Sequence, residues 1–421
     1  MVGGGGREHA LCRAFAATAQ VLCAPGNPGT AEVGTNLPIP ADDAGRLLEA
    51  ARSHGVDLTV IGPEGPLAAG LADAFVAAGR PVFGPSAAAA RIEASKAFAK
   101  AVMADAGVPT ASARSFTRAD EALAYIDRHP EPLVVKASGL AAGKGAVVCA
   151  TRREAADAAR AMFGGRFGAA GEEVVVEAFL EGEELSVFAL TDGERVVLLP
   201  SAQDHKRLGE GDTGPNTGGM GAYTPVSLAT PALLDRVERE VLLPTLRALA
   251  ARGATYRGVL YAGLMIGPDG TPAVIEFNCR LGDPEAQVVL PVTNGDFPAH
   301  CWAIAAGEAW RPAVRHLAPR RAAVTTVLAA RGYPDAPVKG AAISLPHRIP
   351  DDTVLFHAGT TRDAAGLLRA SGGRVLCATG FGATVAAAAE ASRRLADAVT
   401  FEGKVVRRDI GWREIARAGA T

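Results

Sequence analysis

The sequence predicts an α/β and α+β multidomain protein that begins with a doubly wound parallel sheet. At 421 residues the chain is too long for one hydrophobic core. Short apolar runs alternate with helical stretches near the N-terminus, which is typical of a parallel sheet with helices on both faces. A polar connector between Pro312 and Pro319 precedes a segment that opens with a strand at 322–329 and predicts a small, separate α+β domain.

The elements follow in order along the chain. The N-terminal pattern predicts helices 7–19, 43–53 and 66–79 and strands 20–24, 57–61 and 81–83. A long helix is expected at 87–106 and a glycine-rich loop at 164–171. The further strands are 112–116, 132–136, 146–149, 173–177, 184–190, 195–199, 258–266 and 272–277, with helices at 118–129, 152–162, 230–251 and 284–307.

The composition describes a soluble globular protein, with 48% hydrophobic and 21% charged residues and a net charge of −2. It carries no basic field for nucleic acid and no apolar run of the roughly 20 residues that a membrane span needs. We therefore expect neither nucleic acid nor membrane as a partner. The six cysteines have no metal-ligand spacing, and no signal peptide is recognisable, so we expect reduced thiols in a cytoplasmic protein.

Lysine is scarce, because only seven of the 43 basic residues are lysines. Where arginine supplies nearly all the positive charge, the remaining lysines are expected to be needed as lysines. A compact ammonium on a flexible stem suits a phosphate oxygen.

Four glycines at 3–6 stand directly before the first predicted helix. The start of a helix offers free N–H groups to an anion, so this loop predicts a phosphate site. It is not a dinucleotide fingerprint, because the third glycine of GxGxxG would fall on Glu8 or His9. His9 lies at this possible ligand-binding helix start, whereas the histidines without partner spacing are expected to be structural. These are His54, His129, His300, His316, His347 and His357.

A second glycine-rich segment, Ser138–Gly145, lies between two predicted strands. It fails the Walker A pattern because three residues separate Gly139 from Gly143-Lys144 and a strand follows. It therefore predicts a flap over phosphates, although an ordinary glycine hairpin is the alternative. Lys136 ends an otherwise apolar strand and needs an anionic partner, yet no acidic residue is near it in sequence.

Two acidic segments are candidate binding sites. After Glu177, an extended backbone could bind an adenine edge, and Glu184 could accept from a ribose hydroxyl; the alternative is a solvated acidic turn. Glu276 and Asn278 share one face of a strand and suit Mg²⁺. Arg280 follows on that face and could hold a phosphoryl group, with a plain polar strand edge as the alternative.

A cluster of charged residues at 204–207 precedes a glycine-rich loop. Asp204, His205, Lys206 and Arg207 predict a ligand-facing cluster rather than a plain solvated surface. The loop at 212–221 has four glycines and a proline, which predicts a mobile loop that closes over a site and is not core structure.

In order along the chain, these motifs resemble the signature of the ATP-grasp ligases. Further segments resemble the phosphoribosylamine–glycine ligase family, also called glycinamide ribonucleotide synthetases. They are GGREHAL (5–11), APGNPGT (24–30), GPEGPL (62–67), SKAF (95–98), KASGLAAGKG (136–145), QDHKR (203–207), DTGPNTGGMGAY (212–223), YAGLM (261–265), EFNCRLGDPE (276–285), FHAGT (356–360), GGRVL (372–376) and RDIGW (408–412).

The resemblance implies ATP-dependent ligation of glycine to 5-phosphoribosylamine through glycyl phosphate, the second step of de novo purine synthesis. ATP is then the co-substrate, and Mg²⁺ or Mn²⁺ is the metal. The alternatives are another ATP-grasp carboxylate–amine ligase of purine metabolism and a non-catalytic nucleotide-binding protein. We expect a monomer that can make a transient contact with the enzyme that supplies 5-phosphoribosylamine.

The resemblance also implies a role for each candidate residue. Those that would bind ATP are Lys96, Lys136, Gly143, Lys144, Gly145, Glu177, Phe179, Leu180 and Glu184. Metal binding falls to Glu276 and Asn278, and catalysis to Arg280, Lys206 and Asp204. Those that would bind the other substrates are Gly5, Gly6, Arg7, Glu8, Glu64, Asn216, Thr217, Gly218 and Asp283.

The family's architecture implies an N domain over 1–94, an ATP-grasp core over 95–113 plus 184–318, a lid over 114–183 and a C-terminal domain over 319–421. Family members usually place several apolar residues before the first glycine loop, as the central strand of the N domain. Only Met1 and Val2 precede it here. We therefore expect the natural start to lie upstream of Met1, or the chain to have been shortened.

Overall fold

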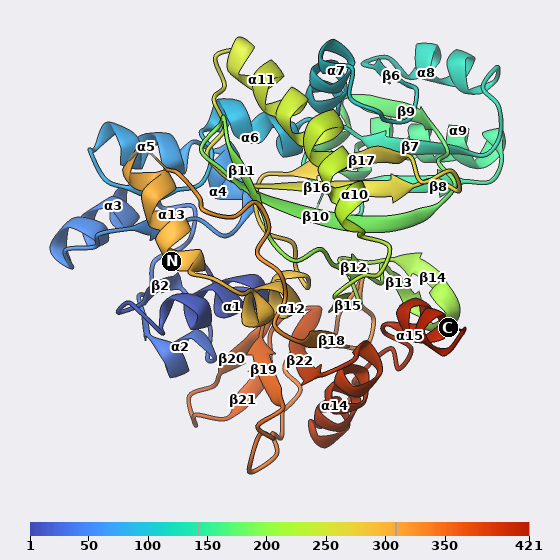
Figure 1. The fold of residues 1–421 in the computed structure, drawn as a ribbon. Coiled ribbons are helices and arrows are strands. Elements are labelled where there is room, and N and C mark those ends of the chain that lie inside the picture. Colours follow the sequence, from blue (N-terminus) through green and yellow to red (C-terminus); the bar gives the residue numbers. More distant parts are fainter. Residues whose placement is uncertain (142, 308–309, 421) are drawn as a thin grey trace.

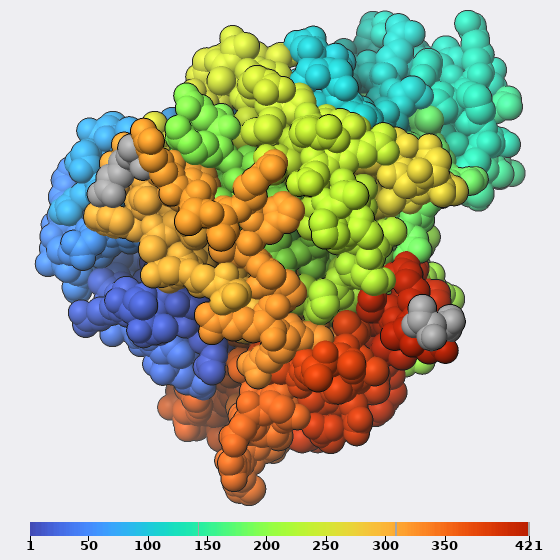
Figure 2. All heavy atoms as spheres, viewed as in Figure 1, coloured from blue at the N-terminus to red at the C-terminus, as the bar shows by residue number. Residues whose placement is uncertain are grey.

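A computed structural model describes residues 1–141, 143–307 and 310–420 of the chain. An N-terminal unit, a small lid and a C-terminal unit surround a central sheet (Figure 1). In the space-filling view the teal lid lies at the upper right and the orange-to-red C-terminal unit lies below it (Figure 2). The predicted multidomain α/β and α+β fold is confirmed. Within the described residues, no helix combines the length and the apolar character needed to cross a membrane.

The N-terminal unit is built on short parallel strands in the order β3-β2-β1-β4-β5, with Val2 joining the two halves through a bridge to Ile61. The strands are β1 Val2–Gly3, β2 Leu22–Pro25, β3 Thr35–Asn36, β4 Thr59–Val60 and β5 Val82–Phe83. The helices are α1 Gly6–Phe15, α2 Thr30–Val33, α3 Ala44–Ser53, α4 Glu64–Ala68 and α5 Leu71–Ala77. The predicted helix 66–79 is wrong, because Gly70 adopts φ +85° and separates α4 from α5.

The predicted long helix 87–106 is also wrong, because it breaks at Ser95 into α6 (Ala87–Ala94) and α7 (Lys96–Ala106). Ser95 has an extended backbone with φ −141°, and its Oγ caps α7 by accepting from the Phe98 N–H at 3.1 Å. The backbone N–H of Lys96 then donates to Ser138 at 2.8 Å. This break therefore places Lys96 in the first turn of a helix that faces the lid.

The lid is an antiparallel sheet in the order β6-β9-β7-β8. Its strands are β6 Ala113–Phe116, β7 Leu133–Ala137, β8 Ala146–Cys149 and β9 Val174–Ala178, and its helices are α8 Ala119–Ile126 and α9 Arg152–Ala161. The predicted strand–loop–strand hairpin around the second glycine segment is confirmed by the pairing of β7 with β8. The predicted loop at 164–171 is instead a π-helical turn at Met162–Arg166 and a 3₁₀ turn at Gly168–Gly171.

The central sheet has the antiparallel order β11-β10-β16-β17. Its strands are β10 Glu183–Thr191, β11 Val196–Leu198, β16 Gly258–Ile266 and β17 Pro272–Asn278. The predicted helix 230–251 is present as α10 Pro231–Val237, a π-helical turn η4 Glu238–Leu242 and α11 Leu243–Ala251. The predicted helix 284–307 is interrupted, because Asp296 caps a new helix. Its parts are α12 Ala286–Val289, η5 Leu290–Val292 and α13 Phe297–Ala306.

The C-terminal unit contains a sheet in the order β12-β15-β18-β22-β19. Its strands are β12 Gln203–Asp204, β15 Gly221–Thr224, β18 Ala322–Ala329, β19 Thr353–His357 and β22 Arg374–Gly382; α14 Val385–Ala398 packs on β22 and β18, and α15 Trp412–Ala420 follows. Smaller elements are β13 Arg207–Gly209, η3 Glu210–Asp212, β14 Thr213–Asn216, β20 Thr360–Arg362 and β21 Leu368–Ala370.

The glycine-rich segment 212–221 takes part in this assembly. Met220 is fully buried, and Gly221 pairs with Thr326 of β18. The prediction that this segment contains no core residue is therefore wrong at its C-terminal end. The six cysteines are buried, free thiols, as predicted.

His9 joins the N-terminal unit to the C-terminal unit. Its Nδ1 accepts a hydrogen bond from the backbone N–H of His357 at 2.9 Å, and its ring meets Phe356 edge-on at 5.4 Å. His9 is 2% exposed and is not among the described residues that line the cavity below, so its contacts here join parts of the chain. Burial lowers the pKa of His9 to about 3 and that of His357 to about 4.

These buried histidines make stability depend on pH. Their folded-state pKa values lie below the unfolded value of about 6.5, so their contribution is present above pH 6.5 and lost as the pH falls. Between pH 6.5 and 5, each histidine should account for a loss of about 2 kcal/mol in the free energy of unfolding. In His9→Gln, the loss between these pH values should be smaller by that amount in urea titrations. The exposed His54→Gln is the control, and an unchanged pH dependence in His9→Gln would contradict the assignment.

Candidate active site

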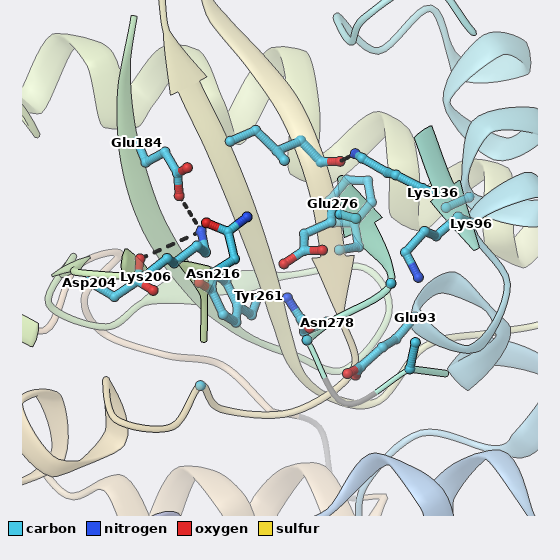
Figure 3. Close-up of a pocket in the computed structure, with 18 of the residues that line it drawn as sticks. Glu93, Lys96, Lys136, Glu184, Asp204, Lys206, Asn216, Tyr261, Glu276 and Asn278 are labelled. Atoms are coloured by element: carbon cyan, nitrogen blue, oxygen red, sulfur yellow. Dashed lines mark hydrogen bonds and ion pairs between the residues drawn. The ribbon is translucent and has the colours of Figure 1, made fainter. Parts of the chain in front are cut away.

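A cavity of about 540 Å³ lies where the lid, the central sheet and the N-terminal unit meet. Four of the seven lysines in the sequence line it. They are Lys96, Lys100, Lys136 and Lys206. Figure 3 shows Lys96 and Lys136 on one side of Glu276 and Lys206 on the other. Three of these lysines, Lys96, Lys136 and Lys206, thus lie on two sides of the Glu276 carboxylate.

One part of the cavity is apolar. Leu140, Val148 and Phe179 line it, and each is more than a third exposed, which is unusual for large apolar side chains that belong to packed elements. Leu180 and Met265 also line this part. The Ala178 N–H still pairs with Ser112 at 2.9 Å, so β9 stays in its sheet up to the point where Phe179 begins. An apolar slot beside a strand end suits a flat ring.

The anionic partner of Lys136 is Glu177. Strand pairing sets Glu177 opposite Val134, and its Oε2 lies 2.9 Å from Lys136 Nζ. Lys100 approaches the other oxygen at 3.3 Å. A bulge in β17 leaves Ile275 out of register with β16, and its carbonyl accepts from Lys136 at 3.0 Å. The Glu177 side chain therefore fixes two lysines at the cavity wall.

Glu276 and Asn278 both line the cavity from β17. Burial opposes ionisation of Glu276, but Lys206, Lys136 and Lys96 outweigh it and lower its pKa below the ordinary value. Glu276 is therefore a charged carboxylate beside an amide oxygen. These are hard oxygen donors, which fit a divalent cation that also binds phosphate oxygens.

Asp204 and Lys206 project into the cavity from the other side. Lys206 Nζ forms a short ion pair with Glu184 and lies 3.6 Å from Asp204. Burial raises the pKa of Asp204 to about 7, although Lys206 opposes the rise. The pKa of Lys206 is raised well above its ordinary value, because the nearby carboxylates outweigh burial. Lys206 is thus a permanent cation at this wall.

His205 and Arg207 do not line the cavity, although the sequence predicted a single ligand-facing cluster. His205 is 1% exposed and its Nε2 accepts from the Gly411 N–H at 2.9 Å. Arg207 donates to the Gly214 carbonyl at 2.7 Å. Alternation along the extended chain explains the split, since every second side chain points to the opposite face.

Arg280 is shared by two carboxylates from different helices. Its Nε lies 3.1 Å from Glu64 of α4, and its Nη2 lies 2.6 Å from Glu93 of α6. Burial raises the pKa of Glu93. Burial also acts to raise the pKa of Glu64, but Arg280 and Arg7 outweigh burial and lower this pKa to about 2. Arg280 therefore connects the N-terminal unit to the end of β17.

The flap contributes backbone rather than its lysine. Gly143 and Gly145 line the cavity, whereas Lys144 Nζ donates to the Pro334 carbonyl of the C-terminal unit at 2.6 Å. Ala142, in the middle of the predicted flap, lies outside the described residues.

The glycine-rich segment after Lys206 also reaches the cavity. Asn216, Thr217 and Gly218 line it, and the Thr217 N–H donates to the Lys206 carbonyl at 2.8 Å. The Gly218 N–H donates to the Tyr333 hydroxyl at 2.9 Å, so this segment is also attached to the C-terminal unit.

The first glycine loop leads into Arg7, which lines the cavity. A side chain at Gly4 would come within 2.6 Å of the Gly26 carbonyl, which explains a glycine there. The Gly5 N–H donates to Glu8 at 2.6 Å and the Arg7 N–H to Asp283 at 3.3 Å. Of the five residues in this region that the resemblance assigns to substrate binding, Arg7 and Asp283 line the cavity, whereas Gly5, Gly6 and Glu8 are not among its described lining residues. The backbone N–H groups at the start of α1 are thus already bound to the carboxylates of Glu8 and Asp283.

Models of the phosphoribosylglycinamide synthetase family match the chain along most of its length. The N-domain model matches residues 1–93, the ATP-grasp (A) domain model 94–286 and the C-domain model 323–413. The chain belongs to the phosphoribosylamine–glycine ligase family. It is 47% identical to the phosphoribosylamine–glycine ligase of Vibrio cholerae serotype O1 over 433 residues, covering 100% of this chain and 99% of the relative.

Other relatives support the same family assignment. The Allochromatium vinosum phosphoribosylamine–glycine ligase is 48% identical over 424 residues, with 99% of this chain and 98% of the relative covered. The crystal structure of the Thermotoga maritima phosphoribosylamine–glycine ligase superposes with a TM-score of 0.85 at 38% identity, covering 97% and 98% of the two chains. A biotin carboxylase domain from Hydrogenobacter thermophilus shares the fold with a TM-score of 0.70 at 19% identity.

Sequence reasoning missed several residues of this family member's cavity. Glu93 lies two residues before the SKAF segment, but its pairing with Arg280 depends on the break at Ser95. Lys100 follows Lys96 by one helical turn and was detectable by that spacing. The Tyr261 hydroxyl donates to Glu285 at 2.8 Å, and the sequence predicted no role for either residue, although both lie in segments that resemble the family.

We expect Lys136→Met to weaken ATP binding by at least about tenfold, because it removes one cation from the cavity wall. Isothermal titration with ATP measures the change. Lys339→Met, at an exposed lysine of the C-terminal unit, is the matched control. Equal ATP affinity in Lys136→Met and the native chain would remove Lys136 from the nucleotide site.

Proposed function

We propose that this chain joins glycine to 5-phosphoribosylamine at the expense of ATP, giving glycinamide ribonucleotide, ADP and phosphate. The observation that carries the proposal is one cavity lined by exposed apolar side chains, a group of lysines, a carboxylate–amide pair and Arg280. Full-length relatives that bear the name phosphoribosylamine–glycine ligase support the choice of substrates.

The proposed reaction has two steps. A carboxylate oxygen of glycine attacks the γ-phosphorus of ATP, the bond to the β–γ bridging oxygen breaks, and ADP leaves. The amine of 5-phosphoribosylamine then attacks the carbonyl carbon of glycyl phosphate; phosphate leaves with the electron pair of the C–O bond, and the nitrogen loses a proton. A neutral amine is already a nucleophile, so positioning and charge neutralisation should supply most of the rate.

The nucleotide end of the cavity fits ATP. We assign the base to the slot formed by Leu140, Val148, Phe179 and Leu180, where apolar side chains face open space. Glu184 would accept from a ribose hydroxyl, which requires one of its oxygens to be free of Lys206.

We assign the binding of the ATP phosphates to the lysines. Lys96 and Lys136 line the wall, and burial lowers the pKa of Lys96, so this ammonium gains from an anionic ligand. The backbone of Gly143 and Gly145 would cover the phosphates. Lys144 is bound to Pro334 in this structure and would need to leave that carbonyl to reach them.

The metal assignment rests on the donor set. Glu276 and Asn278 would hold Mg²⁺ or Mn²⁺, which neutralises phosphate oxygen charge during phosphoryl transfer when it is bound. The chain's own part is to keep Glu276 ionised, and its surrounding lysines do this.

The acceptor end lies near Arg280. Its guanidinium is held by Glu64 and Glu93 and is proposed to steady the acyl phosphate. Arg7, Glu64 and Asp283 are proposed to contact 5-phosphoribosylamine, as are Asn216, Thr217 and Gly218 from the opposite wall. Asp204 and Lys206 would orient glycine. Gly5, Gly6 and Arg7 are proposed to lie near the 5-phosphate, and Glu8 near the same substrate. In this structure the Gly5 N–H donates to Glu8, so this hydrogen bond would have to change for the Gly5 N–H to reach the phosphate.

We also propose that the chain works as a cytoplasmic monomer, with a transient contact to the enzyme that supplies its short-lived amine substrate. Six buried free thiols are in keeping with a reducing compartment.

A coupled assay of ADP release tests this function. With ATP and Mg²⁺ present, ADP should form at full rate only when both glycine and 5-phosphoribosylamine are supplied, and omission of either should lower it to background. Formate or bicarbonate should not replace glycine. Dependence on one of those acids instead would indicate a different ATP-grasp ligase, and no ADP formation with any acid would indicate a nucleotide-binding protein.

A further inference from the structure

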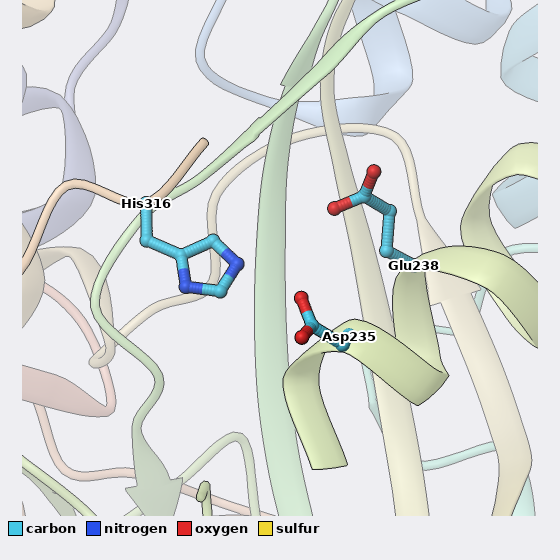
Figure 4. A group of neighbouring side chains, drawn as sticks. All are labelled: Asp235, Glu238 and His316. Carbon is cyan, nitrogen blue, oxygen red and sulfur yellow. The ribbon is translucent and has the colours of Figure 1, made fainter. Parts of the chain in front are cut away.

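Outside the cavity, one cluster of side chains has the composition of a metal site. Asp235 and Glu238 lie one helical turn apart, on α10 and at the start of η4, and His316 lies on the connector that leads to the C-terminal unit. One ligand atom from each of the three residues lies within 4.8 Å of the other two. Figure 4 shows the three side chains gathered between the helix and the connector. The sequence predicted only a structural role for His316.

Buried atoms of this cluster lack hydrogen-bond partners. Glu238 is 6% exposed, and its Oε2 has no partner among the residues that the structure describes. The buried Nε2 of His316 is unpartnered on the same basis. An unpaired buried oxygen or nitrogen is costly, so these two atoms would both gain from a ligand that binds between them.

The backbone holds these donors in place. The Leu198 N–H donates to the carbonyl of Arg315 at 2.8 Å, and the Leu317 N–H donates to the carbonyl of Leu198 at 2.8 Å, which fixes the peptide on both sides of His316. Glu238 begins a π-helical turn, a distortion found most often at functional sites. The donors are therefore preorganised on two separate segments.

We propose that Asp235, Glu238 and His316 bind a first-row divalent metal ion, with Zn²⁺ as the ion they fit best. An imidazole with two carboxylates supplies three protein ligands for zinc and leaves a fourth position for water. Mg²⁺ fits less well, because it prefers oxygen ligands in an octahedron. The bound metal joins the helix of the core to the connector and so fastens the C-terminal unit.

Arg315 competes with the metal. Its Nη2 lies 2.6 Å from Glu238 Oε1, and its side chain is 62% exposed. The guanidinium neutralises one carboxylate, but it can move into water when an ion arrives. Asp235 is exposed, so the ion can enter from solvent without opening the core.

Zinc stoichiometry tests the site. Chelator-treated native chain, dialysed against micromolar free Zn²⁺ and analysed by elemental mass spectrometry, should hold one more equivalent than Glu238→Gln or His316→Asn. Zinc should raise the melting temperature of the native chain but not that of the variants. Arg315→Ala should bind zinc about tenfold more tightly, because the competing cation is gone. These readouts do not depend on ligase activity.

Matched controls are available on the same chain. Glu240→Gln changes a carboxylate on the same helix that pairs with Arg236, and His54→Asn changes an exposed histidine; both should keep the zinc equivalent. If His316→Asn fails to fold, the exposed Asp235→Asn replaces it. Equal zinc content in the native chain and the ligand variants, or no zinc bound at micromolar free metal, would overturn the proposal.

Discussion

Neutralising charge inside one buried cavity is the constraint on which the rest of this structure depends. Glu276 is charged only because lysines surround it, and each of those lysines is held by another part of the chain. Lys136 needs Glu177 and the bulged carbonyl of Ile275. Buried charges without partners cost several kcal/mol each, so the cavity can exist only when its segments meet.

This constraint makes the N-terminal unit part of the site rather than an appendage. Arg280 at the end of β17 is shared between Glu64 of α4 and Glu93 of α6. The break at Ser95 separates α6 from α7, which lets Glu93 face Arg280 while Lys96 faces the lid. A continuous helix would not offer the Lys96 N–H to Ser138.

The C-terminal unit supports the site by holding the segments that line it. Arg407 is fully buried and pairs with Asp212 and Asp409, which ties the glycine-rich segment to this unit. Tyr333 accepts from Gly218, and Pro334 accepts from the flap lysine. The hydrogen bond between His9 and His357 also links α1 of the N-terminal unit to β19 of the C-terminal unit. The two loops proposed to cover the phosphates are thus both attached to the C-terminal unit.

The sequence was sufficient where chemistry depends on spacing within one strand or loop. The Glu276–Asn278 pair, the hairpin around Gly143 and the need of Lys136 for an anion were all readable in this way. The identity of that anion was not, because pairing of β7 with β9 brings Glu177 beside Lys136 across 41 positions. Helix 87–106 was misjudged because a cap at Ser95 and a tertiary hydrogen bond outweighed its alanine-rich helix propensity.

The same distinction explains the first glycine loop. Local sequence favours an anion at the start of α1, and the structure does place anions there, but they are the carboxylates of Glu8 and Asp283. Asp283 is 276 positions away from Arg7, so no local pattern could reveal it. Local pattern predicts the kind of charge that a site needs, and tertiary contacts decide which group supplies it.

Transfer of oxygen from glycine to phosphate tests the central claim most directly. With glycine labelled by ¹⁸O in its carboxylate, the account predicts one ¹⁸O atom in each inorganic phosphate released, because a carboxylate oxygen attacks the γ-phosphorus and leaves with it. Mass spectrometry of the phosphate measures the label during turnover with 5-phosphoribosylamine. Unlabelled phosphate, with the lost ¹⁸O atom found in water or both labelled atoms still in unreacted glycine, would contradict ligation through glycyl phosphate in this cavity.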